Sequence, residues 1–156
     1  PELLEEAREN GIWRVLHKPV DVEQLLESIR EAQPDVAVLV VDDDSDFAEN
    51  VQYMLESAGY AACIALSGED ALARLQRKKP SVLILDLRMP IMGGLEVYTE
   101  LQKRGCNIPT VVVTAYALDE VEVLNQLKSM SVQQVLEKPF EPAVLIDAVR
   151  SVSDAG

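Results

Sequence analysis

Short apolar runs alternate with amphipathic stretches along most of the chain. The runs are rich in Val, Ile, Leu and Ala, and they cover residues 36–41, 61–66, 81–86, 110–114 and 132–137. After each run, apolar residues recur with helical periodicity, over residues 46–58, 69–77, 94–103, 118–130 and 142–152. Continuous apolar strands indicate burial on both faces, which is typical of a parallel sheet covered by helices. The pattern therefore predicts a doubly wound α/β domain over residues 36–154.

Polar side chains stand at the points where the predicted strands end. In chain order they are Asp42, Asp43, Asp44, Asp86, Thr114 and Lys138. In a doubly wound sheet the functional crevice lies at the carboxyl ends of the strands, so these groups should converge there. Converging carboxylates repel one another unless a cation lies between them, and a hard ion such as Mg²⁺ prefers oxygen ligands. A carboxylate can also attack phosphorus, with a metal, an ammonium and a hydroxyl stabilising the developing charge.

Each of these residues also has an ordinary structural interpretation. An Asp run before a helix commonly caps the helix N-terminus. Asp86 could open a turn, Thr114 could simply end a strand, and Lys138 could be a solvated charge. Their joint occurrence at the ends of successive buried strands favours a functional site over these separate interpretations.

The chain resembles the receiver domains of two-component response regulators over roughly residues 36–154. The stretches that carry the resemblance are LVVDDD, LILDLRMPIMGG, VVVTAY and LEKPF. The resemblance implies a flavodoxin-like fold with strand order 2-1-3-4-5. It also implies a signalling role, in which the domain takes a phosphoryl group from a histidine kinase or a histidine phosphotransfer protein. Catalysis would be limited to the domain's own phosphorylation and dephosphorylation, so the resemblance implies a domain that is not an enzyme in the usual sense.

The same resemblance assigns a phosphoacceptor and a metal site. Asp86 would carry the phosphoryl group, and Asp42 and Asp43 would organise Mg²⁺. Asp86 itself and the backbone carbonyl of Arg88 would complete the protein ligands. Asp43 is expected to be a direct ligand, whereas Asp42 is expected to act mainly through water.

The remaining matches and departures concern the fourth and fifth strands and the loop after the third. Thr114 would hydrogen-bond to the phosphoryl group, and Lys138 would form an ion pair with it beside a Lys138–Pro139 bond that is expected to be cis. Val135 stands where the family usually has an aromatic residue, so a signal carried by an aromatic flip is in doubt. Gly93 stands where the family usually has Asp, and its freer backbone is expected to affect the loop more than the chemistry.

Two bulky side chains bear on the lifetime of the phosphorylated state. Arg88 and Tyr116 lie two residues after the acceptor and the hydroxyl positions, which in receivers border the path of the attacking water. Neither side chain can activate water as a carboxylate would. If they cover the phosphoryl group, self-dephosphorylation should be slow; the alternative is that both point to solvent.

Other classes of function fit these residues less well. A phosphatase of the haloacid-dehalogenase kind needs a second Asp two residues after its nucleophile, where this chain has Arg88. A nucleotide-binding domain would need a Gly-rich phosphate loop after the first strand, and the sequence has none there. A purely structural pseudo-receiver would not need all the chemical groups that this sequence carries.

Residues 1–33 resemble the last third of a second receiver. Lys18 and Lys138 are 120 residues apart (138 − 18 = 120), and the sequence around them aligns without a gap. The segment has a helix, strand and helix pattern but no acidic pair, no acceptor Asp and no Thr. We therefore expect it to be the tail of a preceding receiver in a longer tandem protein, inert in phosphorylation. Its apolar face should pack on the complete domain or on a second copy of the chain, as a homodimer.

Composition narrows the range of partners. Lys and Arg total 14 against 27 Asp and Glu, a net charge of −13, which argues against direct nucleic acid binding. No apolar run approaches the ~18 residues that would predict membrane insertion. Cys63 and Cys106 match no metal or redox spacing, and this usage favours a reducing, cytoplasmic location.

Overall fold

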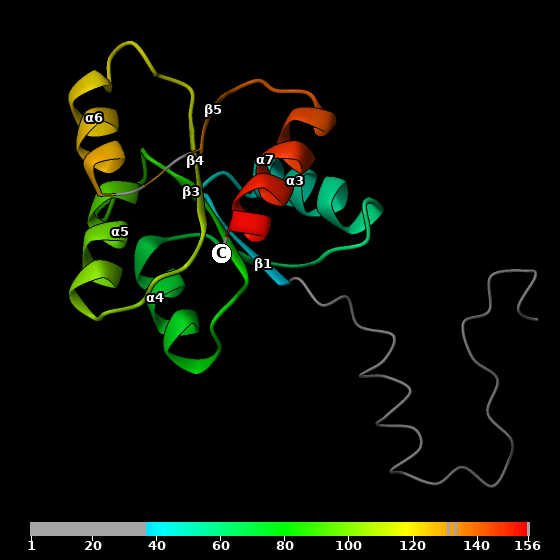
Figure 1. Cartoon of the computed structure of the whole chain (residues 1–156), viewed down its shortest axis with the longest axis horizontal. Helices are drawn as coiled ribbons and strands as arrows, with labels where there is room; N and C mark the ends of the chain where they lie inside the picture. Colours follow the sequence, from blue (N-terminus) through cyan, green and yellow to red (C-terminus); the bar gives the residue numbers. More distant parts are fainter. Residues whose placement is uncertain (1–36, 131, 133, 156) are drawn as a thin grey trace, which may run out of the picture. The chain divides into compact units, whose positions relative to one another are not determined.

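Five strands alternate with five helices over residues 37–130, 132 and 134–155, which are the residues that the computed structural model describes (Figure 1). The elements are β1 (Ala37–Val41), α3 (Ser45–Ser57), β2 (Ala61–Ala65), α4 (Gly68–Arg77), β3 (Val82–Asp86), α5 (Gly94–Lys103), β4 (Thr110–Thr114), α6 (Val121–Ser129), β5 (Gln134–Glu137) and α7 (Pro142–Ala155). The interpretation of residues 1–33 as a partial receiver lies outside the described residues.

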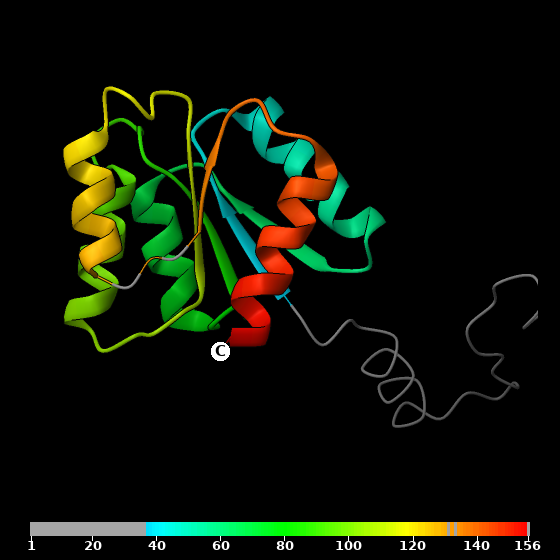
Figure 2. The ribbon, with the colours of Figure 1, turned by 45° about the horizontal axis from the view of Figure 1, so that its top comes forward.

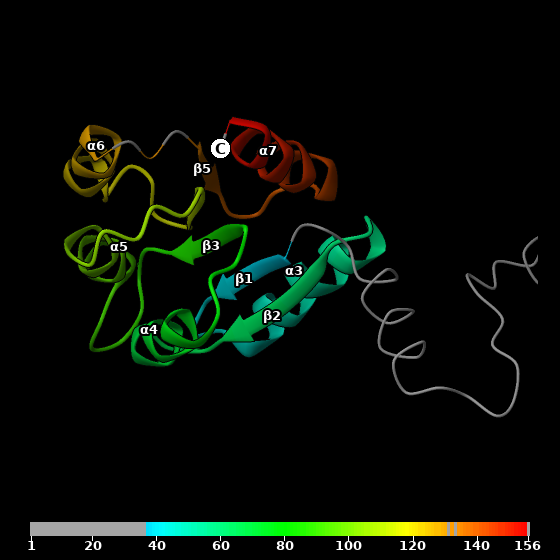
Figure 3. The same ribbon diagram turned by 60° about the horizontal axis from the view of Figure 1, so that its bottom comes forward.

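The five strands form one parallel sheet in the order β2-β1-β3-β4-β5. Figure 3 shows the arrowheads of β1, β2 and β3 pointing the same way. Every residue of β3 and of β4 is buried, as expected for strands covered on both faces. The sheet order and the alternation of strands and helices confirm the flavodoxin-like, doubly wound fold.

Helices cover both faces of this sheet and enclose two separate cores. Figure 2 shows α4, α5 and α6 on one face and α3 and α7 on the other. Successive strand residues point to opposite faces, so Leu83 and Leu85 of β3 pack toward α4 and α5, while Val82 and Ile84 pack toward α3 and α7. The residues at the carboxyl ends of β3 and β4 are therefore held in place by central strands that are buried along their whole length.

Helix ends agree closely with the sequence pattern, except at the start of α6 and at the end of α7, which continues beyond the predicted residue 152 to Ala155. Gly59 and Gly105 have positive φ angles of 95° and 70° just after α3 and α5, as is common where a helix ends at glycine. The predicted helix over residues 118–130 begins later, at Val121, because Leu118 is 89% exposed and lies in a preceding turn.

Candidate functional site

The carboxyl ends of β1 and β3 bring three carboxylates together. Asp42 and Asp43 follow β1 directly, and Asp86 is the last residue of β3. Their carboxylate oxygens all lie within 4.8 Å of one another. Asp42 and Asp86 are 2% and 6% exposed, whereas Asp43 is open to solvent. The predicted cluster therefore has two buried members and one accessible member.

Both carboxylate oxygens of Asp42 already accept hydrogen bonds. Oδ1 accepts from the backbone N–H of Asp44 at 2.9 Å, and Oδ2 accepts from Nζ of Lys138 at 2.8 Å. Asp44 in turn caps α3, because its side chain accepts from the backbone N–H of Phe47 at 3.2 Å. Two interpretations of the Asp run thus hold for different members of it: Asp44 caps the helix, while Asp42 and Asp43 belong to the cluster.

Lys138 enters the cluster from the end of β5. Its Nζ lies 2.8 Å from Asp42 Oδ2 and 3.4 Å from Asp86 Oδ1. Burial alone would lower the pKa of Lys138, but the hydrogen bond to Asp42 and the charge of Asp86 outweigh burial and raise the pKa above its usual value. Lys138 is therefore a firmly charged ammonium that partly neutralises two buried carboxylates.

Asp86 is a buried carboxylate whose charge Lys138 compensates only in part. Burial, followed by repulsion from Asp42, raises its pKa from 3.8 to about 6, although Lys138 acts in the opposite direction. Asp43 adds further repulsion. The residual negative charge at this point makes the cluster a favourable place for an additional cation.

The donor set fits a hard divalent cation. All three groups offer carboxylate oxygens, and no nitrogen or sulfur ligand accompanies them among the described residues of this cluster. The exposure of Asp43 leaves one side open, so that an ion there could retain water molecules. These are the conditions under which Mg²⁺ binds proteins, through a few carboxylates together with water.

Thr114 is the last residue of β4, the strand that lies next to β3 in the sheet. Its hydroxyl accepts a hydrogen bond from the backbone N–H of Tyr116 at 3.0 Å, and the side chain is almost fully buried. The carbonyl of Thr114 accepts from the backbone N–H of Lys138 at 2.8 Å, which ties the two strand ends together. The Lys138–Pro139 bond is cis, as the family resemblance implied.

Arg88 and Tyr116 contact each other across two loops. The Arg88 guanidinium lies 4.1 Å from the centre of the Tyr116 ring and forms an ion pair with Glu120, at the start of α6. Both side chains are about half exposed, Arg88 at 50% and Tyr116 at 49%. They neither extend freely into solvent nor pair with Asp86: they form a stacked bridge from the β3–α5 loop to the β4–α6 loop.

Two glycines let the β3–α5 loop return close to Asp86. A Cβ on Gly94 would lie 2.4 Å from the carbonyl oxygen of Asp86, and one on Gly93 would lie 2.9 Å from that of Leu87. Gly93 has an ordinary extended backbone, with φ −79° and ψ 174°. The observed constraint at Gly93 is therefore space, and its expected effect on the loop rather than on the chemistry stays a prediction.

Val135 lies half-buried in β5 and packs against the core on the α4 and α5 face. At this position the family usually has an aromatic residue. The aromatic ring that lies beside Lys138 is instead Phe47 of α3, at 4.0 Å, and Phe140 packs edge-on against it. Sequence reasoning did not select Phe47, Phe140 or Glu120 as part of the site, because an isolated aromatic or acidic residue at a helix start gives no distinctive signal.

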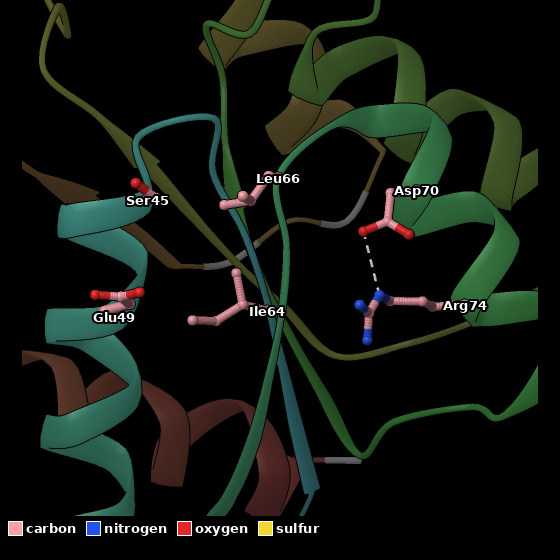
Figure 4. A pocket seen from close by; sticks show the side chains of 6 residues that line it. All are labelled: Ser45, Glu49, Ile64, Leu66, Asp70 and Arg74. Atoms are coloured by element: carbon pink, nitrogen blue, oxygen red, sulfur yellow. Dashed lines mark hydrogen bonds and ion pairs between the residues drawn. The ribbon is translucent and has the colours of Figure 1, made fainter.

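A hollow of about 320 Å³ lies beside the edge strand β2 (Figure 4). It is lined from α3, β2 and α4 by Ser45, Glu49, Ile64, Leu66, Asp70 and Arg74. Arg74 forms an ion pair with Asp70 at 3.2 Å, one turn away on the same helix. None of the predicted site residues lines this hollow, so the hollow is separate from the carboxylate cluster.

The fold and the cluster together define a class of protein: a doubly wound α/β domain with carboxylates, a lysine and a hydroxyl at the carboxyl end of its sheet. The family model of the response regulator receiver domain matches residues 38–150, and the chain belongs to this family. Receiver domains are signalling domains of two-component systems rather than classical enzymes. They receive phosphoryl groups from histidine kinases or phosphotransfer proteins.

Individual relatives agree with the family. The chain is 34% identical over 120 residues to the transcriptional regulatory protein FixJ of Rhizobium meliloti (strain 1021), covering 77% of this chain and 58% of that protein. It is 35% identical over 109 residues to a response regulator receiver protein of Anaeromyxobacter sp. (strain Fw109-5), covering 70% of this chain and 45% of that protein. The crystal structure of FixJ-N has a TM-score of 0.71 at 32% identity, covering 78% of this chain and 96% of that chain. The chain spans about half the length of the curated relatives it matches.

Among the described residues, no helix is both long enough and apolar enough to cross a membrane.

Proposed function

We propose that this receiver domain accepts a phosphoryl group on Asp86 from a phosphohistidine, with Mg²⁺ bound beside it, and changes conformation as a result. The observation that carries the proposal is the environment of Asp86. It lies at the end of a fully buried central strand, next to two further carboxylates and 3.4 Å from the Lys138 ammonium. A carboxylate in this position is held by a buried strand, its negative charge is only partly compensated, and the Lys138 ammonium lies close to it.

In the proposed reaction, an oxygen of the Asp86 carboxylate attacks phosphorus and the bond from phosphorus to the histidine nitrogen breaks. The leaving imidazole nitrogen keeps the electron pair of that bond. Lys138 then moves its ammonium from the two carboxylates toward the phosphoryl oxygens, where it offsets the added negative charge. The Thr114 hydroxyl, at the adjacent strand end, donates a hydrogen bond to the same group.

We propose Asp42, Asp43, Asp86 and the backbone carbonyl of Arg88 as the residues that hold Mg²⁺. When bound, the ion supplies positive charge that stabilises the phosphoryl oxygens during transfer. Asp43 is the member best suited to direct ligation, because its carboxylate is accessible to solvent. Asp42 is suited to act through water, because both of its oxygens already accept hydrogen bonds within the protein.

The acceptor assignment is tested by incubating the protein with acetyl phosphate and Mg²⁺. Intact-mass spectrometry should show addition of one phosphoryl group to the wild type and none to Asp86→Asn. Asp147→Asn on the exposed face of α7 serves as the matched control and should be labelled normally. Full labelling of Asp86→Asn would refute the assignment.

The metal site is tested with Asp43→Ala. The change removes the accessible ligand, so Mg²⁺ binding, followed by calorimetry, and the rate of phosphorylation should fall together, the rate by at least tenfold. Asp46→Ala, on the first turn of α3 but outside the cluster, is the control and should retain both. Normal phosphorylation of the wild type in EDTA would show that the metal assignment is wrong.

A further inference from the structure

A pair of aromatic rings adjoins the ammonium group of the site. The centre of the Phe47 ring lies 4.0 Å from Nζ of Lys138, well within the distance at which a ring face attracts a cation. Phe140 meets Phe47 edge-on, with ring centroids 5.9 Å apart and an interplanar angle of 84°. The ring of Phe47 therefore faces the cation while its own position is supported from the side.

The backbone fixes Phe47 in this position. Phe47 lies in the first turn of α3, and its N–H donates to the capping carboxylate of Asp44. The N–H of Asp44 in turn donates to Asp42, which is also the closest partner of Lys138. The ring and the ammonium are thus positioned by the same short stretch of chain.

Lys138 has three neighbours, and they respond differently to phosphorylation. The carboxylates of Asp42 and Asp86 attract its ammonium in the structure described here. A bound cation or a phosphoryl group on Asp86 would draw those carboxylates away from Lys138. The Phe47 ring takes part in neither event, so its attraction persists while the ammonium changes partner.

We propose that Phe47 is a positioning residue for Lys138, whose ring face holds the ammonium over the site while Lys138 exchanges carboxylate partners for phosphoryl oxygens. This inference rests on the proposed role of Asp86 as acceptor. It differs from simple packing because it depends on the negative face of the ring, which packing alone does not require.

The test replaces Phe47 with phenylalanines carrying one, two and three ring fluorines, introduced at this position only. Fluorination withdraws charge from the ring face while nearly preserving shape. The initial rate of phosphorylation by sub-saturating acetyl phosphate in excess Mg²⁺ should fall stepwise, by about threefold to tenfold in total. Phe47→Tyr, which retains the ring face, should keep a rate close to that of the wild type.

Phe140 provides the matched control, since it is the other phenylalanine of the chain and its ring contacts Phe47. The same fluorinated series at Phe140 should lower the rate less than the series at Phe47, because the Phe140 ring contacts Phe47 and Phe47 contacts the Lys138 ammonium. A flat or rising series at Phe47, or an equal decline at Phe140, would overturn the inference. Phosphorylation of Asp86→Asn would instead contradict the proposed function, so the two failures are distinguishable.

Discussion

Asp42, Asp43 and Asp44 have the same side chain and three different environments. The first is buried and accepts two hydrogen bonds, the second is open to solvent, and the third caps a helix. The sequence predicted that carboxylates gather at this strand end. The roles expected for Asp42 and Asp43 came from the family resemblance, and the apolar pattern alone could not show which member of the run caps α3.

Asp86 should limit the stability of the metal-free domain at neutral pH. Its raised pKa, about 6, means that the folded protein holds this proton more tightly than the unfolded chain, whose value is near 3.8. The stabilisation from that proton is complete below pH 3.8 and is lost as the pH rises through 6. In EDTA at pH 7.5, Asp86→Asn should therefore raise the free energy of unfolding by roughly 1–2 kcal/mol, after discounting for solvent screening.

Urea unfolding at two pH values checks this expectation. The advantage of Asp86→Asn should shrink between pH 7.5 and pH 5, because the wild type regains its proton over that interval. Asp147→Asn, an exposed carboxylate on α7, should differ from the wild type by less than about 0.5 kcal/mol at both values. A stability difference that is independent of pH would mean that the charge of Asp86 is not its cause.

At the scale of elements, the β3–α5 and β4–α6 loops are joined by Arg88, Tyr116 and Glu120. Glu120 is the N-cap residue of α6, yet its side chain makes no capping hydrogen bond and pairs with Arg88 instead. This interaction joins segments that are distant in the sequence, so local periodicity could not predict it.

This bridge should prolong the phosphorylated state. Loss of the phosphoryl group requires water in line with phosphorus, opposite the Asp86 oxygen. We expect the stacked side chains of Arg88 and Tyr116 to hinder that approach, and neither of them can act as a base that activates the water. Arg88→Asn combined with Tyr116→Glu should accelerate phosphate loss at least threefold, measured by mass spectrometry after removal of acetyl phosphate.

Arg104→Asn is the matched control for this measurement. Arg104 also forms an exposed ion pair, with Glu100 on α5 at 3.1 Å, but it belongs to no loop of the site. Its replacement should leave the decay rate unchanged. An unchanged rate in the double variant would show that the bridge does not control lifetime.

At the scale of the whole molecule, the apolar pattern predicted the number, type and nearly all the bounds of the elements. It did so because central strands such as β3 and β4 are buried on both faces, and their middle residues are all apolar. The strand order came from the family resemblance, since burial alone does not specify which strands are neighbours. The ring beside Lys138 went unpredicted because Phe47 and Lys138 are separated by 91 residues (138 − 47 = 91).

The receiver should function without the segment that precedes it. The described residues from β1 onward form a complete sheet with two closed cores, and the family match lies entirely within them. A protein comprising residues 36–156 should therefore fold and be phosphorylated by acetyl phosphate at the rate of the full chain.

The association state tests the role of residues 1–33 in the same experiment. Sedimentation should show the full chain as a dimer and residues 36–156 as a monomer. If both proteins had the same number of chains per particle, a dimer formed through the leading segment would be refuted. Loss of phosphorylation on truncation would show that the segment is not inert.

The unequal burial of β3 and β5 has a consequence for local opening of the sheet. β3 is wholly buried between two neighbours, whereas β5 is a short edge strand in which Leu136 is the buried residue. Edge segments with few buried contacts separate at a lower free-energy cost than central strands. We therefore expect the strand that ends at Asp86 to open only with global unfolding, and the edge strand that precedes Lys138 to open more readily. A phosphoryl group bound by both would make the opening of β5 rarer, so the signal can take the form of a changed opening frequency while the central strands keep their positions.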